Sequence, residues 1–171
     1  PDPNKIKKIF IRSSKYTIRL LAEKSKWDPK TVVDLQFSMP YQAARALIKG
    51  KIGTDDFTEE CLNDSLARKL IGMVEVVEDA EFERRYPDQY SSAVTVTMEN
   101  GTEYTAVVDN PKGDKRNPIS HSDVENKFRT LVQKIFNDSG RVQQIIDYVN
   151  DLENAENIAD LMKLINVENL K

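Results

Sequence analysis

Cysteine and histidine are almost absent from this chain of 171 residues, which contains one of each. Cys61 has no partner for an internal disulfide, so the sequence is not that of a small disulfide-stabilised secreted protein. Because His121 is the one histidine, a structural zinc site is also excluded, since such sites take about four Cys or His ligands. We therefore expect no structural zinc site in this chain. As a separate expectation, it binds no cofactor.

Glycine and long apolar runs are scarce as well. The six glycines form no P-loop pattern, and no stretch approaches the ~18 apolar residues of a membrane helix. The first ten residues, PDPNKIKKIF, lack the apolar core of a signal peptide and begin without methionine. We interpret Pro1 as a boundary within a longer protein, and we expect that protein to be cytoplasmic.

Charged residues are abundant, at 31% of the chain, and unevenly placed. Residues 1–30 carry nine Lys or Arg against three acids, whereas residues 54–83 carry ten acids against two bases. The net charge of −3 gives no indication of nucleic-acid binding. The basic stretch is either a solvated face whose charges deter edge pairing, the commoner role, or a region that attracts anionic substrates.

Alternating patterns predict a sheet. KIKKIFIR at Lys5–Arg12 reads as a strand with either a bulge or an end buried on both faces, and Met73–Glu78 reads as a second strand. Ser92–Met98 and Thr102–Val108 alternate on either side of Asn100-Gly101. That dipeptide predicts a hairpin with a type I′ turn, in which both central residues have positive φ.

Helical patterns occupy much of the remaining chain. Pro40 is expected at the start of a helix that ends at Gly50. Thr54–Asp56 and then Asn63 or Asp64 are expected to cap further short helices, and Ser120 with Asp123 predicts a capping box. Three amphipathic helices are expected near the C-terminus, at 120–136, 142–152 and 158–165.

The order of these elements predicts the fold class α+β. We expect an antiparallel or mixed sheet of about four strands with helices on one face, formed by residues 1–137. The break at Asn137–Gly140 and the acidic composition beyond it separate residues 138–171, which we expect to be C-terminal helices of another packing unit.

Two spaced motifs carry a family resemblance. The first is FSMPY at Phe37–Tyr41, followed by Ala43-Ala44 and Gly50; the second is NPKGDKRNPIS at Asn110–Ser120, before Lys127-Phe128. In this order, on either side of a predicted hairpin, they resemble the MmgE/PrpD family over about residues 5–137. The last 34 residues are similar to the C-terminal helices of that family.

The resemblance implies a function. The family contains metal-independent lyases and isomerases, such as 2-methylcitrate dehydratase, cis-aconitate decarboxylase and iminodisuccinate epimerase, which act on small di- and tricarboxylates. Its members have a helical domain with most catalytic groups and a smaller α+β domain that closes over the active site. This chain resembles the smaller domain with the returning helices. Its implied partners are a carboxylate substrate, the helical domain and a second copy in a homodimer, with no nucleic acid or membrane.

The candidate site residues follow from the same motifs, and each has a plainer alternative. Tyr41 matches the family tyrosine that reaches the active site, as a hydrogen-bond or proton donor, but core packing is equally compatible with the pattern. Ser38 is a candidate substrate-binding residue, although capping a helix is the commoner role. Gly113 is a candidate for anion binding through backbone N–H groups, or simply a residue with positive φ. His121 reads as a surface residue and Cys61 as a small buried one.

Two functions remain open at this point. The chain is either the lid domain of an MmgE/PrpD-type enzyme, inactive by itself, or a non-catalytic structural or binding module of the same fold. The sequence does not distinguish dehydration from decarboxylation or epimerisation.

Overall fold

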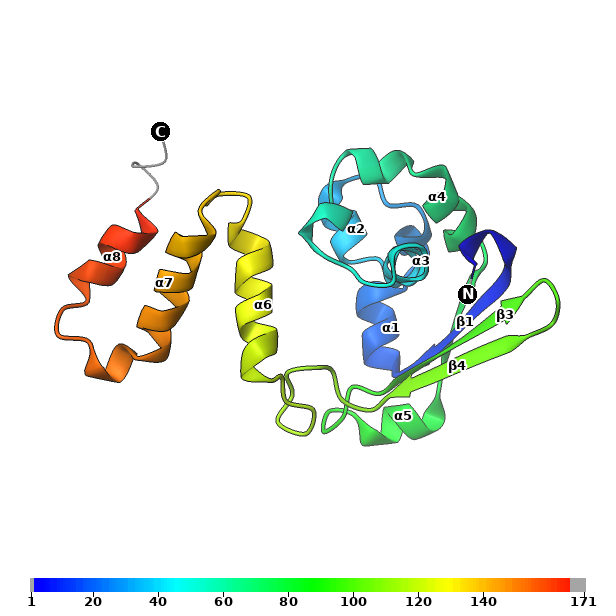
Figure 1. The fold of residues 1–171 in the computed structure, drawn as a ribbon. Coiled ribbons are helices and arrows are strands. Elements are labelled where there is room, and N and C mark those ends of the chain that lie inside the picture. The colour runs from blue at the N-terminus through cyan, green and yellow to red at the C-terminus, as the bar shows by residue number, and fades with distance from the viewer. Residues whose placement is uncertain (1, 167–171) are drawn as a thin grey trace. The chain divides into compact units, whose positions relative to one another are not determined.

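A computed structural model describes residues 2–166 of the chain (Figure 1). They form two compact units, with the division between Asn117 and Pro118.

The first unit is built on a four-stranded mixed sheet with the order β2-β1-β3-β4. The strands are β1 (Ile6–Ser13), β2 (Val74–Glu78), β3 (Ser92–Met98) and β4 (Glu103–Val108). β1 pairs in parallel with β2 and antiparallel with β3, which pairs antiparallel with β4. The parallel pair requires a long crossover, and the helices between β1 and β2 supply it.

β1 contains the irregularity that its sequence indicates. The pairing with β3 shifts between Ile6 and Lys8, which confirms the bulge. Ile9 and Ile11 are then buried on the core face, while Arg12 lies on the other face. The extra residue in the bulge lets Ile6 share the core face with Ile9 although the two are three positions apart. Over Ile9 to Ile11 the pairing is regular, and Phe10 is half-buried on the other face.

The β3–β4 hairpin is confirmed, but its predicted turn type is wrong. Of the residues at the turn, Gly101 alone has positive φ, at 84°, and Asn100 does not. Gly101 donates its N–H to the Met98 carbonyl at 2.9 Å, and Met98 donates to the Thr102 carbonyl at 2.8 Å. This is the pattern of a three-residue loop with glycine in the left-handed position, which requires no positive φ at Asn100.

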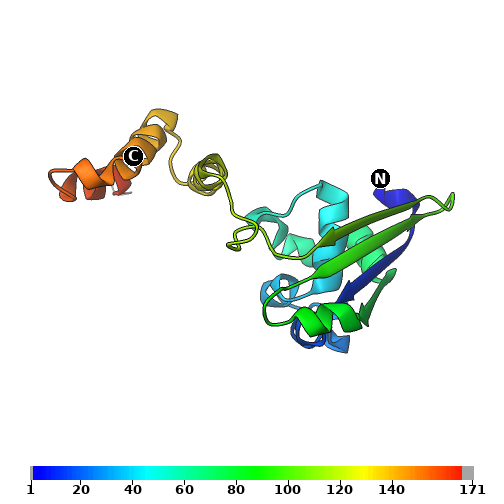
Figure 2. The ribbon, with the colours of Figure 1, turned by 90° about the horizontal axis from the view of Figure 1, so that it is seen from below.

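Helices cover one face of the sheet, as Figures 1 and 2 show. They are α1 (Lys15–Leu21), α2 (Val32–Gln36), α3 (Met39–Lys49) and α4 (Ser65–Ile71), joined by the 3₁₀ turns η2 (Lys24–Trp27), η3 (Thr54–Asp56) and η4 (Glu60–Asn63). A further turn, η1 (Pro3–Lys5), precedes β1. The short helix α5 (Ala80–Arg85) lies against the opposite face, where Phe82 packs under Arg12.

The core of the first unit lies between the sheet and α2 to α4. It includes Ile6, Ile9, Ile11, Leu35, Tyr41, Ala44, Leu70, Ile71, Val96 and Met98. β4 is an edge strand, and all six of its residues are exposed. Its side chains therefore contribute little to this core.

Capping residues set several helix boundaries as expected. Asp64 caps α4, and Gly50 ends α3 with φ of 76°. The helix expected after Thr54–Asp56 is wrong, because those residues form only the 3₁₀ turn η3.

The second unit consists of α6 (His121–Val132), α7 (Ser139–Asn150), the turn η5 (Leu152–Asn154) and α8 (Ala159–Ile165). The capping box of Ser120 and Asp123 at the start of α6 is confirmed. A small core joins Phe136 with Val142, Ile145 and Ile146 of α7.

The fold class α+β is confirmed by this mixed sheet and its helices. The structural division at 117/118 lies before the expected boundary at 137, so α6 groups with the later helices. The expectation that residues 138–171 pack on another helical domain stays a prediction.

Candidate functional site

The start of α3 is the centre of the first candidate site. Ser38 is fully buried, and its hydroxyl accepts the Tyr41 N–H at 3.1 Å while donating to the Lys26 carbonyl at 2.5 Å. Pro40 lies in the first turn, where its missing N–H leaves no hydrogen bond unmade. The capping role of Ser38 is thus confirmed, whereas substrate binding by its hydroxyl stays a prediction.

Tyr41 lies in the core of the first unit, with only 1% of its surface exposed. Its hydroxyl donates a hydrogen bond to the Asp56 backbone carbonyl, and its ring packs against Phe57 at a centroid distance of 6.1 Å. Burial raises the pKa of the Tyr41 phenol, and the nearby Cys61 thiol raises it further. In this conformation Tyr41 is a neutral hydrogen-bond donor that is closed off from solvent.

Beside Tyr41, one turn further along α3, Arg45 joins two carboxylates. Its Nε lies 2.6 Å from Asp56 Oδ1 and its Nη1 lies 2.6 Å from Asp64 Oδ2. Arg45 and Asp56 are both only 8% exposed. Burial raises the pKa of Asp56, but the Gly53 N–H and the Arg45 charge outweigh this effect and hold it below its ordinary value. The Arg45–Asp56 pair therefore stays ionised inside the unit.

Cys61 completes this cluster. The thiol is buried and lies 3.3 Å from Thr58 Oγ1 and 3.8 Å from Arg45 Nη2. Burial raises the pKa of the Cys61 thiol, but hydrogen bonds from Thr58 and the Arg45 charge outweigh it and leave the pKa below its ordinary value. The cluster lies under a polar pocket, lined by Arg45, Asp55, Thr58, Glu60, Cys61 and Asp64. Cys61 is buried as expected, but its surroundings are partly polar.

Gly113 lies in the loop that follows β4. It has φ of 102°, and its N–H donates to the Asn117 carbonyl at 2.8 Å. The positive φ explains why glycine stands there. In the same loop Arg116 pairs with Asp114 and lowers the pKa of that carboxyl to about 2. Since the Gly113 N–H is already used within the loop, its role in binding an anion stays a prediction.

His121 is a surface residue at the start of α6, as expected. Its Nε2 lies 2.9 Å from Asn150 Oδ1 of α7, and Asn150 Nδ2 donates to Glu125 at 2.9 Å. These three residues stand at the rim of an apolar pocket between α6 and α7.

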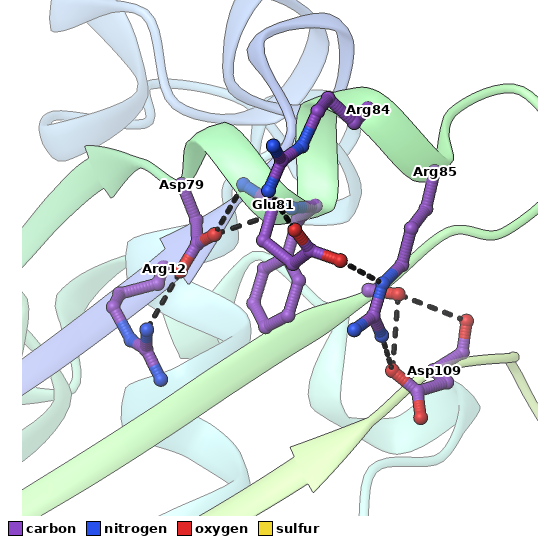
Figure 3. A network of polar contacts seen from close by, with 8 residues as sticks. Arg12, Asp79, Glu81, Arg84, Arg85 and Asp109 are labelled. Atoms are coloured by element: carbon purple, nitrogen blue, oxygen red, sulfur yellow. Dashed lines mark hydrogen bonds and ion pairs between the residues drawn. The ribbon is translucent and has the colours of Figure 1, made fainter.

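A second polar network lies at the opposite face of the sheet, around α5 (Figure 3). Asp79 caps α5 and pairs with Arg12 at 2.6 Å, while Arg85 bridges Glu81 and Asp109. The guanidinium groups of Arg12 and Arg85 both lie over the Phe82 ring, 5.5 and 6.0 Å from its centroid. This network fastens α5 to β1 and to the end of β4.

Residues 2–166 contain neither a metal-binding cluster nor a membrane-spanning helix. No group of three or more His, Cys, Asp or Glu side chains there is placed to hold a metal ion. In the same part of the chain, no helix combines the length and the apolar character that crossing a bilayer requires.

Sequence reasoning missed the Arg45 cluster. Arg45 is 11 residues from Asp56 and 19 from Asp64 in the chain, so no local pattern joins them. The one available signal was an arginine among the apolar positions of α3, one turn after Tyr41.

Comparison with known proteins gives the family. Residues 1–152 match the model of the MmgE/PrpD C-terminal domain. The chain is 27% identical to cis-aconitate decarboxylase of Mus musculus over 80% of the present chain. It is 29% identical to a cis-aconitate decarboxylase-like protein of Aspergillus oryzae over 82% of the present chain. In both cases it spans 28% of the relative's length. It is also 30% identical to mitochondrial 2-methylcitrate dehydratase of Yarrowia lipolytica, over 57% of this chain and 19% of that protein.

Proposed function

Since the chain belongs to the MmgE/PrpD family as its C-terminal domain, we propose that it is the lid of a cofactor-independent lyase or isomerase acting on small di- or tricarboxylates. It closes over an active site that it shares with an N-terminal helical domain. The observation that carries this proposal is the family match over residues 1–152, with relatives named as a decarboxylase and a dehydratase. The substrate, the helical domain and a second copy are its partners.

The chemistry of such substrates explains the need for a lid. Breaking a bond next to a carboxylate leaves negative charge on an enediolate-like species, which fixed hydrogen-bond donors and cations stabilise. A general acid and a general base must also flank the reacting carbon. A closing domain excludes water and strengthens each of these interactions.

A basic stretch within the first unit supports an anionic substrate. Lys15, Arg19 and Lys24 lie on this stretch, and all three are exposed. Exposed cations on one short stretch of chain attract dianionic and trianionic molecules at a distance.

Tyr41 is the residue of this chain that we propose for the chemistry. A neutral phenol donates a hydrogen bond to a substrate carboxylate or delivers a proton to it. Its hydroxyl donates to the Asp56 carbonyl in this structure, so in the working enzyme it must exchange that partner for the substrate.

One observation favours the alternative, a non-catalytic module of the same fold. The hydroxyl groups of Ser38 and Tyr41 and the N–H of Gly113 all have partners inside the chain. In a purely structural domain this arrangement would be permanent.

Turnover measurements on the complete protein test the proposal. We expect the protein that includes the helical domain to consume cis-aconitate, 2-methylcitrate or a related acid, and the 171-residue chain alone to consume none. Absence of turnover by the complete, folded protein over a panel of di- and tricarboxylates would favour the module.

A further inference from the structure

We propose that residues 51–63, called the strap below, form a hinged segment that closes over the Tyr41 side chain and is fastened by Arg45. The strap joins α3 to α4 and contains the turns η3 and η4. Opening it exposes Tyr41 and Cys61 without unfolding the sheet or α3.

The strap supplies the surroundings of the Tyr41 hydroxyl. Asp56 offers the carbonyl that accepts its hydrogen bond, Phe57 packs against its ring, and the Cys61 thiol acts on its ionisation. All three residues lie between 54 and 61. Because Tyr41 itself belongs to α3, moving the strap alone uncovers its polar end.

Arg45 fastens the strap near its middle and at the residue that follows it. Its bond to Asp56 holds the turn η3, where the other Asp56 oxygen accepts the Gly53 N–H at 2.8 Å. Its bond to Asp64 holds the point where the strap enters α4, because Asp64 also caps that helix through the Leu66 and Ala67 N–H groups. One guanidinium thus sets the position of the whole segment.

The strap is the kind of segment that opens locally. Residues 51–55 are all exposed, and the segment has two single 3₁₀ turns in place of longer regular structure. Gly50, at its start, has φ of 76°, and a Cβ at Gly53 would meet no atom within 4 Å. The buried apolar side chains of the strap are Cys61 and Leu62, both near its C-terminal end. Segments with exposed backbone hydrogen bonds open at a free energy below that of global unfolding.

The catalytic consequence rests on the proposed function, because Tyr41 reaches a substrate only when the strap is open. The strap itself is tested without turnover. Cys61 is the one cysteine of the chain and belongs to the strap itself. Its buried thiol faces Arg45 of α3 and the Asp55 carbonyl, so its alkylation by iodoacetamide reports the opening. A failed labelling test and a failed activity test are therefore distinguishable.

The experiment measures Cys61 alkylation in the 171-residue chain at low urea concentrations. We expect wild-type labelling to depend only weakly on urea, as a local opening does, and D64N to label about tenfold faster, since it loses a hydrogen bond between charged groups. Asparagine caps helices about as well as aspartate, so α4 is retained. D79N is the matched control, because Asp79 also caps a helix and pairs with an arginine at 2.6 Å, away from the strap. We expect it to leave native labelling unchanged.

Labelling that depends on urea as steeply as global unfolding would overturn the proposal, as would equal acceleration by D64N and D79N. Hydrogen exchange on the wild-type chain provides a second test if D64N does not fold. We expect the Asp56 and Cys61 amides of the strap to exchange at least about 10²-fold faster than the Gln42 amide of α3. Equal protection would show that the strap opens only with the whole unit.

Discussion

Arg45 Nε and Asp56 Oδ1 lie 2.6 Å apart inside the first unit, and each residue is only 8% exposed. A buried pair of this kind adds little net stability over an apolar pair, but removing one partner leaves an uncompensated charge. The pair therefore fixes the geometry around Tyr41, and its disruption has a measurable cost.

We expect Arg45→Met to lower the free energy of unfolding by about 3–5 kcal/mol, because the buried Asp56 then lacks its cation. Urea denaturation followed by circular dichroism measures the change. Arg84→Met is the matched control, since Arg84 is exposed and pairs with Glu81 on the surface of α5. That variant should lose less than about 1 kcal/mol. Equal losses in the two variants would show that the Arg45 pair has no special role.

The ionisation of Asp56 should contribute to the pH dependence of the free energy of unfolding. Its pKa in the folded chain is below the ordinary value of 3.8, so the folded carboxyl binds protons more weakly than the unfolded one. The contribution of Asp56 to the free energy of unfolding is therefore complete at pH values above its ordinary pKa. It is lost as the pH falls through the lowered pKa of the folded chain. We expect Asp56→Asn to give a shallower loss of stability than wild type as the pH falls from about 5 to 2. Parallel profiles for the two proteins would contradict this assignment.

The turn of the β3–β4 hairpin offers a test of backbone strain. Gly101→Ala should cost about 1 kcal/mol, because alanine disfavours the positive φ of 84° although its Cβ meets no neighbour. Gly53→Ala is the control, since Gly53 has extended backbone and an equally open Cβ position. It should be neutral or slightly stabilising. Thermal melts of both variants measure the change in stability. A loss of stability in Gly53→Ala as large as that in Gly101→Ala would point to a cause other than φ.

Much of the fold was predictable because its signals are local. Alternation located the strands, and side-chain caps located the starts of α3, α4 and α6. The helices α1 and α5 were missed because each spans only two turns or less and presents no long apolar face. The turn at Asn100-Gly101 was misassigned because the same dipeptide serves both two-residue and three-residue loops.

The candidate site was predictable only in part. The FSMPY motif indicated Ser38 and Tyr41, and the cap formed by Ser38 follows from its place before Pro40. The partners of Tyr41 and Arg45 were not predictable, because Asp56, Cys61 and Asp64 come from the strap and from α4. Such contacts depend on how the chain folds back on itself, which no short pattern records.

The steady-state kinetics of Tyr41→Phe in the complete protein test the central claim most directly. Phenylalanine keeps the ring but removes the hydroxyl, and loss of a positioned proton donor lowers kcat/KM by about 10²–10⁴-fold. Tyr104→Phe, at an exposed tyrosine of β4, is the matched control and should leave kcat/KM unchanged. A denaturant melt separates this effect from the loss of about 1–3 kcal/mol expected when the Asp56 carbonyl loses its donor. We predict a fall of at least about 10²-fold for Tyr41→Phe alone; an unchanged kcat/KM in a folded variant would contradict a catalytic role for Tyr41.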